Sequence, residues 1–125
     1  MITPTIEQLA AALEQSWSKE TTYFPDRWSA TSPATGQGAV TALVVQDYLG
    51  GELLRTTVDG QSYYLNELPD GSQVNLTAAQ FGAGTVFTTP ARSTREHVLG
   101  TPATVARYNL LKERVAMVLG FRPKP

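Results

Sequence analysis

The longest apolar run of the chain lies at residues 39–49 and is bounded by glycines at both ends. It is apolar on nearly all sides, which predicts a helix from Gly38 to about Leu49 that is buried all round. Gly50 and Gly51 supply the left-handed residues that commonly end a helix. The first turn of this helix presents free N–H groups and partial positive charge, and Gly38 places no side chain there.

Two further helices are predicted on either side of this central one. Apolar residues spaced three and four apart follow Thr5, and Gln8 completes a capping box, so a first helix should run from Thr5 to about Trp17. Thr101 and Pro102 should open a last helix that ends at Gly120. Between the first two helices, residues 18–36 form a long connection with no clear periodicity.

Alternating runs after the central helix predict a small antiparallel sheet. The predicted strands are 52–58, 61–68 and 72–76, with a fourth, edge strand at 85–89. Asp59-Gly60 is a strong hairpin signal between the first two strands. Capping boxes at 77–80 and 93–96 predict two short helices, the second closed by Gly100.

These elements make an α+β fold, with the central helix packed on a sheet of three or four strands. At 125 residues the chain should be one domain, 1–125, with an ordered core at about 5–119 and a tail at 120–125. A five-residue loop between Asn66 and Ser72 would place Tyr63 opposite Asn75. If the sheet folds back on the central helix, this pair comes near Gly38.

Composition excludes several kinds of chemistry. The formal net charge is −1, which argues against nucleic-acid or membrane surfaces. The chain has no cysteine and one histidine, His97, expected at the surface, so we expect no disulfide, no metal site and no cofactor. No apolar stretch is long enough for a membrane span and no signal-peptide pattern opens the chain, so we expect a cytoplasmic protein.

Several blocks of the sequence resemble the YunG-like family of small bacterial proteins. The resemblance runs from about residue 8 to about residue 118, in order and spacing, through Ser16-Trp17-Ser18-Lys19-Glu20-Thr21, Gly36-Gln37, residues 39–48, Gly51 to Arg55, Leu68-Pro69-Asp70-Gly71 and Leu76-Thr77. It implies a minimal papain-like core, of the NlpC/P60-like kind.

The family pattern carries a cysteine at position 38, a histidine at 63 and an aspartate at 75, and usually a tryptophan at 65. Such residues at a helix start and on neighbouring strands would suit thiol chemistry. This chain has Gly38, Tyr63 and Asn75 instead. The resemblance therefore implies a degenerate member with no catalytic residues, more plausibly a non-enzyme than an enzyme.

The surviving cleft is the candidate ligand site. Its candidate residues are Gln37, Gly38, Tyr63, Asn75, Trp17 and Trp28. Each also has a structural interpretation: Gln37 could cap a loop, Tyr63 and Asn75 could be a hydrogen-bonded pair, and both tryptophans could be anchors. Tyr64 and Asn66 should face the other way.

The function predicted from the sequence is a binding or regulatory module for an unknown peptide, protein or small molecule. Its oligomeric state is left open between monomer and homodimer. One alternative is a hydrolase or transferase with non-cysteine chemistry in the same cleft, which would require Arg55 beside the Tyr63 oxygen. Another is a structural role in which exposed aromatic residues at 23–28 form a dimer interface.

Overall fold

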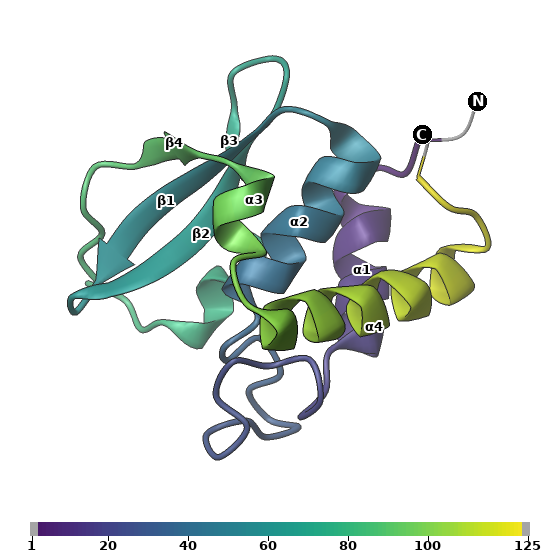
Figure 1. Cartoon of the computed structure of the whole chain (residues 1–125), viewed down its shortest axis with the longest axis horizontal. Coiled ribbons are helices and arrows are strands. Elements are labelled where there is room, and N and C mark those ends of the chain that lie inside the picture. The colour runs from purple at the N-terminus through teal and green to yellow at the C-terminus, as the bar shows by residue number, and fades with distance from the viewer. Residues whose placement is uncertain (1–2, 124–125) are drawn as a thin grey trace.

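Helix α2 (Gly38–Leu49) lies at the centre of the structure, a computed structural model that describes residues 3–123 (Figure 1). Leu43, Val44 and Val45 have no exposed surface, so the helix is buried as its apolar run predicts. Gly50 ends it with φ of 76°. The predicted extent of this helix is confirmed.

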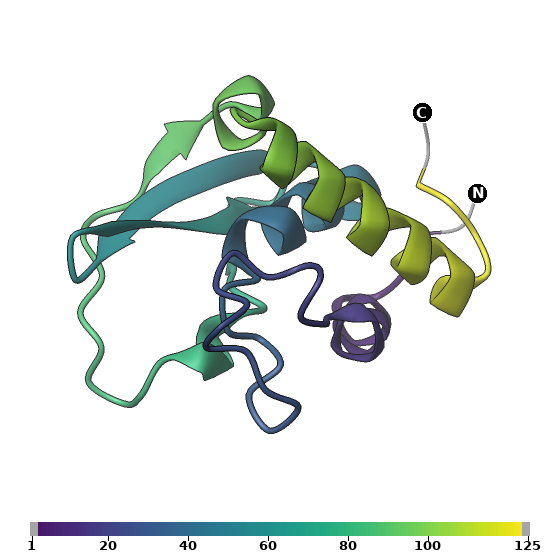
Figure 2. The ribbon, with the colours of Figure 1, turned by 60° about the horizontal axis from the view of Figure 1, so that its bottom comes forward.

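Helices α1 (Ile6–Ser16) and α4 (Pro102–Leu119) pack against each other on one side of the structure, and α4 also packs on α2 (Figure 2). Thr5 caps α1 and forms the predicted capping box with Gln8. Thr101 caps α4 and Gly120 ends it in the left-handed region. Both end helices thus form where their local signals place them.

A four-stranded antiparallel sheet covers the other side of α2. Its strands are β1 (Glu52–Val58), β2 (Gln61–Glu67), β3 (Gln73–Val74) and β4 (Ala91–Ser93), in the order β3-β2-β1-β4. The turn between β1 and β2 contains Asp59 at φ 51° and Gly60 at φ 78°, as its Asp-Gly sequence favours. The α+β class and the antiparallel sheet are confirmed.

The two faces of the sheet have different partners. Leu53 belongs to the main core, and the Asn66 amide donates to the carbonyl oxygen of Ala42 on α2. Tyr63 pairs with Thr56 and shares the opposite face with Leu65. Alternation along β2 therefore separates Tyr63 from Asn66, as expected from the sequence. The Asn66 face packs along α2, while the Tyr63 ring meets the start of that helix at Gly38.

The predicted edge strand at 85–89 is wrong. The fourth strand is β4 at Ala91–Ser93, paired with Leu53–Arg55 of β1. In the 85–89 stretch the Thr88 N–H donates to the Thr57 carbonyl oxygen, but Pro90 has no N–H to continue a ladder. Strand formation there was overestimated because β-propensity depends on what a segment can pair with.

The register predicted between the second and third strands is also wrong, by two residues. Asn66 pairs with Val74 and Glu67 with Gln73, and β3 then ends before Asn75. The prediction fixed the loop length at five residues, whereas the Leu68 N–H bonds Ser72 and closes a tighter turn. A shift of two residues keeps each side chain on its face, so Tyr63 and Asn75 stay on one side of the sheet.

Two predicted capping boxes form differently. The helix at Ala78–Gln80 (η1) is a single 3₁₀ turn, and its preceding residue Thr77 makes no side-chain cap bond. Helix α3 (Arg95–Val98) is capped by Thr94, one residue after the predicted position. At the end of the chain, Phe121 packs on the core and its carbonyl oxygen accepts from the Tyr48 hydroxyl, so the predicted tail is partly docked.

Of the predicted tail, residues 124 and 125 lie outside the described part of the chain. Within residues 3–123, no helix has the length and apolar character needed to cross a lipid bilayer.

Candidate functional site

The ring of Tyr63 lies directly against Gly38 at the start of α2. A Cβ atom at position 38 would lie 2.9 Å from Cε1 and 3.1 Å from Cδ1 of this ring, closer than such atoms pack. It would also lie 3.6 Å from the Tyr64 carbonyl oxygen, so α2 begins against the backbone of β2. Glycine at 38 and tyrosine at 63 are therefore sterically matched.

Hydrogen bonds hold the Tyr63 hydroxyl on its other side. It donates to Oδ1 of Asn75, and with its only proton used there, it accepts from the Thr77 hydroxyl. The rings of Phe81 and Phe87 lie 4.9 and 5.9 Å from the Tyr63 ring, centroid to centroid. Gly38, Tyr63 and Asn75 thus come together in one place, with Tyr63 between the other two.

This setting suits tyrosine as a neutral hydrogen-bonding group. Burial raises the pKa of Tyr63 to about 12, and the bonds from Thr77 and Asn75 offset burial only in part. The phenol is therefore protonated at neutral pH and can serve as neither base nor nucleophile there.

The first prediction concerns this phenol. In an ultraviolet titration, Tyr63 should ionise well above pH 10, and Tyr63→Phe should remove one late-titrating tyrosine. Tyr108, whose pKa is also raised to about 12, should remain in that variant as an internal reference. In the unfolded chain this tyrosine ionises near pH 10. The stability that its raised pKa contributes to the folded state is therefore fully present below pH 10 and is lost as the pH rises toward 12. Loss of an early-titrating tyrosine instead would contradict the assignment.

A groove of about 750 Å³ opens beside the start of α2. Its lining includes residues of the 18–36 loop, of the β1–β2 turn and of the start of α2. The remaining lining includes side chains from β2, from η1 and the residue after it, and from α3 and α4, namely Tyr63, Tyr64, Gln80, Phe81, Val98 and Thr104. Such a volume is typical of a small-ligand site.

Gln37 does not line this groove. It is fully buried, its Oε1 accepts from the Thr21 hydroxyl at 2.8 Å, and its Nε2 donates to the Ser18 carbonyl oxygen at 3.1 Å. Its amide therefore closes the 18–21 turn against the start of α2, which is the loop-capping interpretation.

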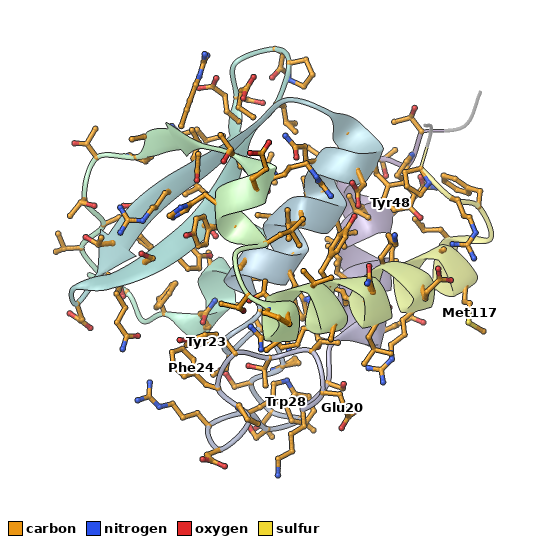
Figure 3. The ribbon with its side chains drawn as sticks, in the orientation of Figure 1. Glu20, Tyr23, Phe24, Trp28, Tyr48 and Met117 are labelled. Carbon is orange, nitrogen blue, oxygen red and sulfur yellow. The ribbon has the colours of Figure 1, made fainter. Side chains whose placement is uncertain are left out.

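Neither tryptophan lines the groove. Trp17 is buried in the core and its indole N–H donates to Thr41 on α2 at 2.9 Å. Trp28 donates to the Pro33 carbonyl oxygen and so pins the outer part of the 18–36 loop to itself. In Figure 3, Trp28 lies farther from the sheet than Tyr23 and Phe24 of the same loop. Both tryptophans act as anchors.

Asn75 lines a second, smaller hollow of about 480 Å³, together with Leu65 and Phe87. Tyr63 lines the groove but not this hollow, and its hydroxyl reaches Asn75. Of the six candidate residues, the structure therefore brings only Gly38 and Tyr63 to the groove itself.

Arg55 does not lie beside the Tyr63 oxygen. It pairs with Tyr64, not Tyr63, across the β1–β2 ladder, and its Nε donates to the Ser62 hydroxyl. The cation that a tyrosine-assisted reaction would need is therefore absent from its expected place. Within residues 3–123, no group of three or more acidic or histidine side chains is placed to hold a metal ion.

The sequence prediction missed the charged residues of the groove, Arg27 and Asp59. Arg27 lies in the aperiodic loop, whose path the sequence does not reveal. Asp59 is the first residue of the hairpin turn, and this conformational role explained it fully at the level of the sequence, so its position at the groove was not predicted. Exposed Tyr23 and half-buried Phe24, considered from the sequence as part of a possible dimer interface, also line the groove, and the Arg27 guanidinium lies over the Phe24 ring.

Comparisons with known proteins agree with the resemblance in the sequence. A family model described as "YunG protein" matches residues 5–120. The chain is 36% identical over 78 residues to "Uncharacterized protein YunG" of Bacillus subtilis (strain 168), an alignment that covers 62% of this chain and 64% of the relative. The aligned part thus spans less than two thirds of that relative. No solved structure gives a significant match.

Proposed function

This chain belongs to the YunG family, and from that premise we propose that it is a non-catalytic relative of papain-like cysteine hydrolases, acting as a binding module. Its ligand site is the groove at the start of α2. The single observation that carries the proposal is the packing of the Tyr63 ring on Gly38. At the position where a thiol would sit, the chain has no side chain, and a ring has taken the space.

Two further observations support binding without catalysis. The Tyr63 phenol is protonated at neutral pH like any ordinary tyrosine, and burial raises its pKa still further. The groove beside it is nevertheless open, and the first-turn N–H groups of α2 have no partners within the helix. The thiol-based acyl transfer that the family pattern implies needs a cysteine nucleophile and a histidine base, and the residues that line this groove include neither.

The second prediction follows from the missing nucleophile. The protein should not accelerate hydrolysis of 4-nitrophenyl acetate or of a peptide 4-nitroanilide above the buffer rate. The matched control is Tyr63→Phe, which removes the hydroxyl but keeps the ring. Turnover by the unmodified protein that disappears in Tyr63→Phe would contradict the proposal.

Restoring the three family residues tests whether the backbone at positions 38, 63 and 75 still suits thiol chemistry. In the triple variant Gly38→Cys, Tyr63→His and Asn75→Asp, the smaller imidazole should make room for the cysteine side chain. Appearance of an iodoacetamide-reactive thiol with a pKa below the ordinary value of about 8.5 would support a papain-like ancestry. A thiol of ordinary pKa would count against it.

A further inference from the structure

One edge of strand β2 is covered along only part of its length. Strand β3 pairs with β2 at Asn66 and Glu67, whereas β2 begins at Gln61. In the order β3-β2-β1-β4, no other strand formed by residues 3–123 lies on that side of β2. Figure 1 shows β3 beside the end of β2 that is far from the β1–β2 turn. The part of β2 that follows the turn therefore has a free edge.

The alternation of the β1–β2 ladder identifies the backbone groups on this edge. In an antiparallel pair, every second residue turns its N–H and C=O away from the partner strand. Gln61 directly follows the two-residue turn, so its backbone groups face β1, and those of Ser62 and Tyr64 face outward. Further along the same edge, the Leu68 N–H donates to the Ser72 carbonyl oxygen at 2.8 Å, as this alternation requires.

Within residues 3–123, the outward groups of Ser62 and Tyr64 make no backbone hydrogen bond. Ser62 is exposed, and only its hydroxyl has a partner, the Arg55 guanidinium. The Tyr64 carbonyl oxygen faces Gly38, 3.6 Å from the place of a Cβ there, so we count only the Tyr64 N–H as free. Ser62 N–H, Ser62 C=O and Tyr64 N–H thus form a row that an adjoining strand could pair with.

This free edge lies inside the groove. The β2 residues that line the groove are consecutive, Gln61, Ser62, Tyr63 and Tyr64, and residues of the 18–36 loop and of the start of α2 line it with them. An edge enclosed in this way suits a single extended chain better than the edge of a second folded sheet. The occupant that these backbone groups fit is therefore a peptide segment.

We propose that the groove binds an extended segment of a partner polypeptide, which adds to the sheet as a strand beside residues 61–64. This inference rests on the proposed function, because it names the partner class of the same groove. Backbone bonds supply affinity in such complexes, and alternate side chains supply selectivity. The ligand residue opposite Tyr63 shares its face, where the Phe81 ring lies 4.9 Å away between centroids, so we expect an apolar side chain there.

The third prediction is tested by hydrogen exchange measured by NMR. In the free protein, the outward amides of Ser62 and Tyr64 should exchange about tenfold faster or more than those of Tyr63 and Leu65, which face β1. The probe is an octapeptide selected for binding from a random phage-displayed library. Its addition should slow exchange at Ser62 by about tenfold or more.

Two variants of one residue test the backbone bond itself. Ser62→Pro removes the outward N–H, and no bond to β1 is lost with it. Ser62→Ala is the matched control, because both variants lose the hydroxyl that bonds Arg55 and only one loses the N–H. The octapeptide should bind Ser62→Pro about tenfold more weakly than Ser62→Ala.

A second measurement leaves the protein unchanged, in case proline disturbs the strand. The octapeptide is N-methylated at one residue at a time, which removes one backbone donor in each derivative. Strand addition predicts that the residue whose N–H meets the Ser62 carbonyl oxygen is sensitive and that its two immediate neighbours, which face away, are not.

The outcomes distinguish this inference from the proposed function. A library that yields no octapeptide protecting Ser62, or an octapeptide that tolerates N-methylation at every residue, overturns strand addition, whereas the absence of ester turnover would still support a non-catalytic role. Protection of Ser62 by dimerisation of the protein alone would also overturn it, in favour of an edge shared by two copies. Cleavage of the bound octapeptide would overturn the proposed function instead.

Discussion

Replacing Gly38 with alanine is expected to lower the free energy of unfolding by about 1–3 kcal/mol, the typical cost of overpacking a fitted site. Alanine normally stabilises a helical position over glycine, by about 0.5–1 kcal/mol. The sign should reverse here because the new Cβ would lie 2.9 Å from Cε1 of Tyr63. Urea unfolding of the two proteins measures the difference.

The ring cannot simply move aside. Its hydroxyl is bonded to Asn75 and Thr77, and its ring packs in a T-shaped arrangement with the Phe81 ring, 4.9 Å between centroids. A shift that relieves the clash would therefore strain or break these contacts. This fourth prediction accordingly measures how firmly Tyr63 is held over the start of α2.

A double-mutant cycle identifies the cause. Valine at position 63 lacks the two ring atoms that meet the Cβ, so Gly38→Ala should cost much less in a Tyr63→Val background. Gly82→Ala is the matched glycine control, since a Cβ at Gly82 meets nothing within 4 Å and its φ is not positive. An equal cost of Gly38→Ala in both backgrounds would refute the steric match.

The sequence could predict the elements whose signals are local. Thr5 and Gln8 bond each other within one turn, so their capping box forms regardless of the rest of the fold. The Asp59-Gly60 turn and the left-handed Gly50 follow from backbone sterics in the same way. The burial of α2 was also predictable, because a helix that is apolar on all sides is buried in the core.

Pairing between distant segments was less predictable. β4 forms at Ala91–Ser93 because it meets β1 there, and no property of these three residues announces a strand. The Thr85–Thr89 run has stronger β-propensity, yet it has no ladder partner beyond the single bond of Thr88. The presence of a pairing partner, rather than local β-propensity, therefore decided which segment became the fourth strand.

The candidate site was predictable to the same degree. Alternation along β2 and a short loop are enough to bring Tyr63 and Asn75 to one side, even with the register two residues wrong. The role of Gln37 could not be predicted from the sequence, because its partners Ser18 and Thr21 lie in a loop with no periodic pattern. The same loop carries Arg27, so the charges of the groove could be read only from the structure.

Replacing Asp47 with alanine is expected to lower the free energy of unfolding by about 2–3 kcal/mol, less than is typical for a buried ion pair because this pair is only partly buried. Asp47 lies in the last turn of α2, where Oδ1 is 3.1 Å from the Arg95 guanidinium and Oδ2 accepts from the Tyr108 hydroxyl at 2.5 Å. Arg95 also donates to Gln46 and Tyr108, so one carboxylate joins α2, α3 and α4. Urea unfolding at neutral pH measures this fifth prediction.

Asp47→Asn is the matched control, because it keeps an acceptor oxygen but removes the charge. The pKa of Asp47 is raised, chiefly by burial, while Tyr108, Arg95 and Lys112 act in the opposite direction. An acid with a raised pKa contributes stability that is present below its unfolded value, about 3.8, and is lost as the pH rises through its folded value. The stability of the natural protein relative to Asp47→Asn should therefore decrease as the pH rises from about 3.

The direction of this change distinguishes burial from pairing as the dominant influence on the carboxylate. If the bonds from Arg95 and Tyr108 outweighed burial, the pKa would be lowered, and the relative stability would increase with pH. Unfolding free energies of both proteins at pH 3 to 7 decide between the two, since all other carboxylates are common to both and cancel in the difference. An increase with pH would show that the Arg95–Asp47 pair stabilises the ionised carboxylate by more than burial disfavours it.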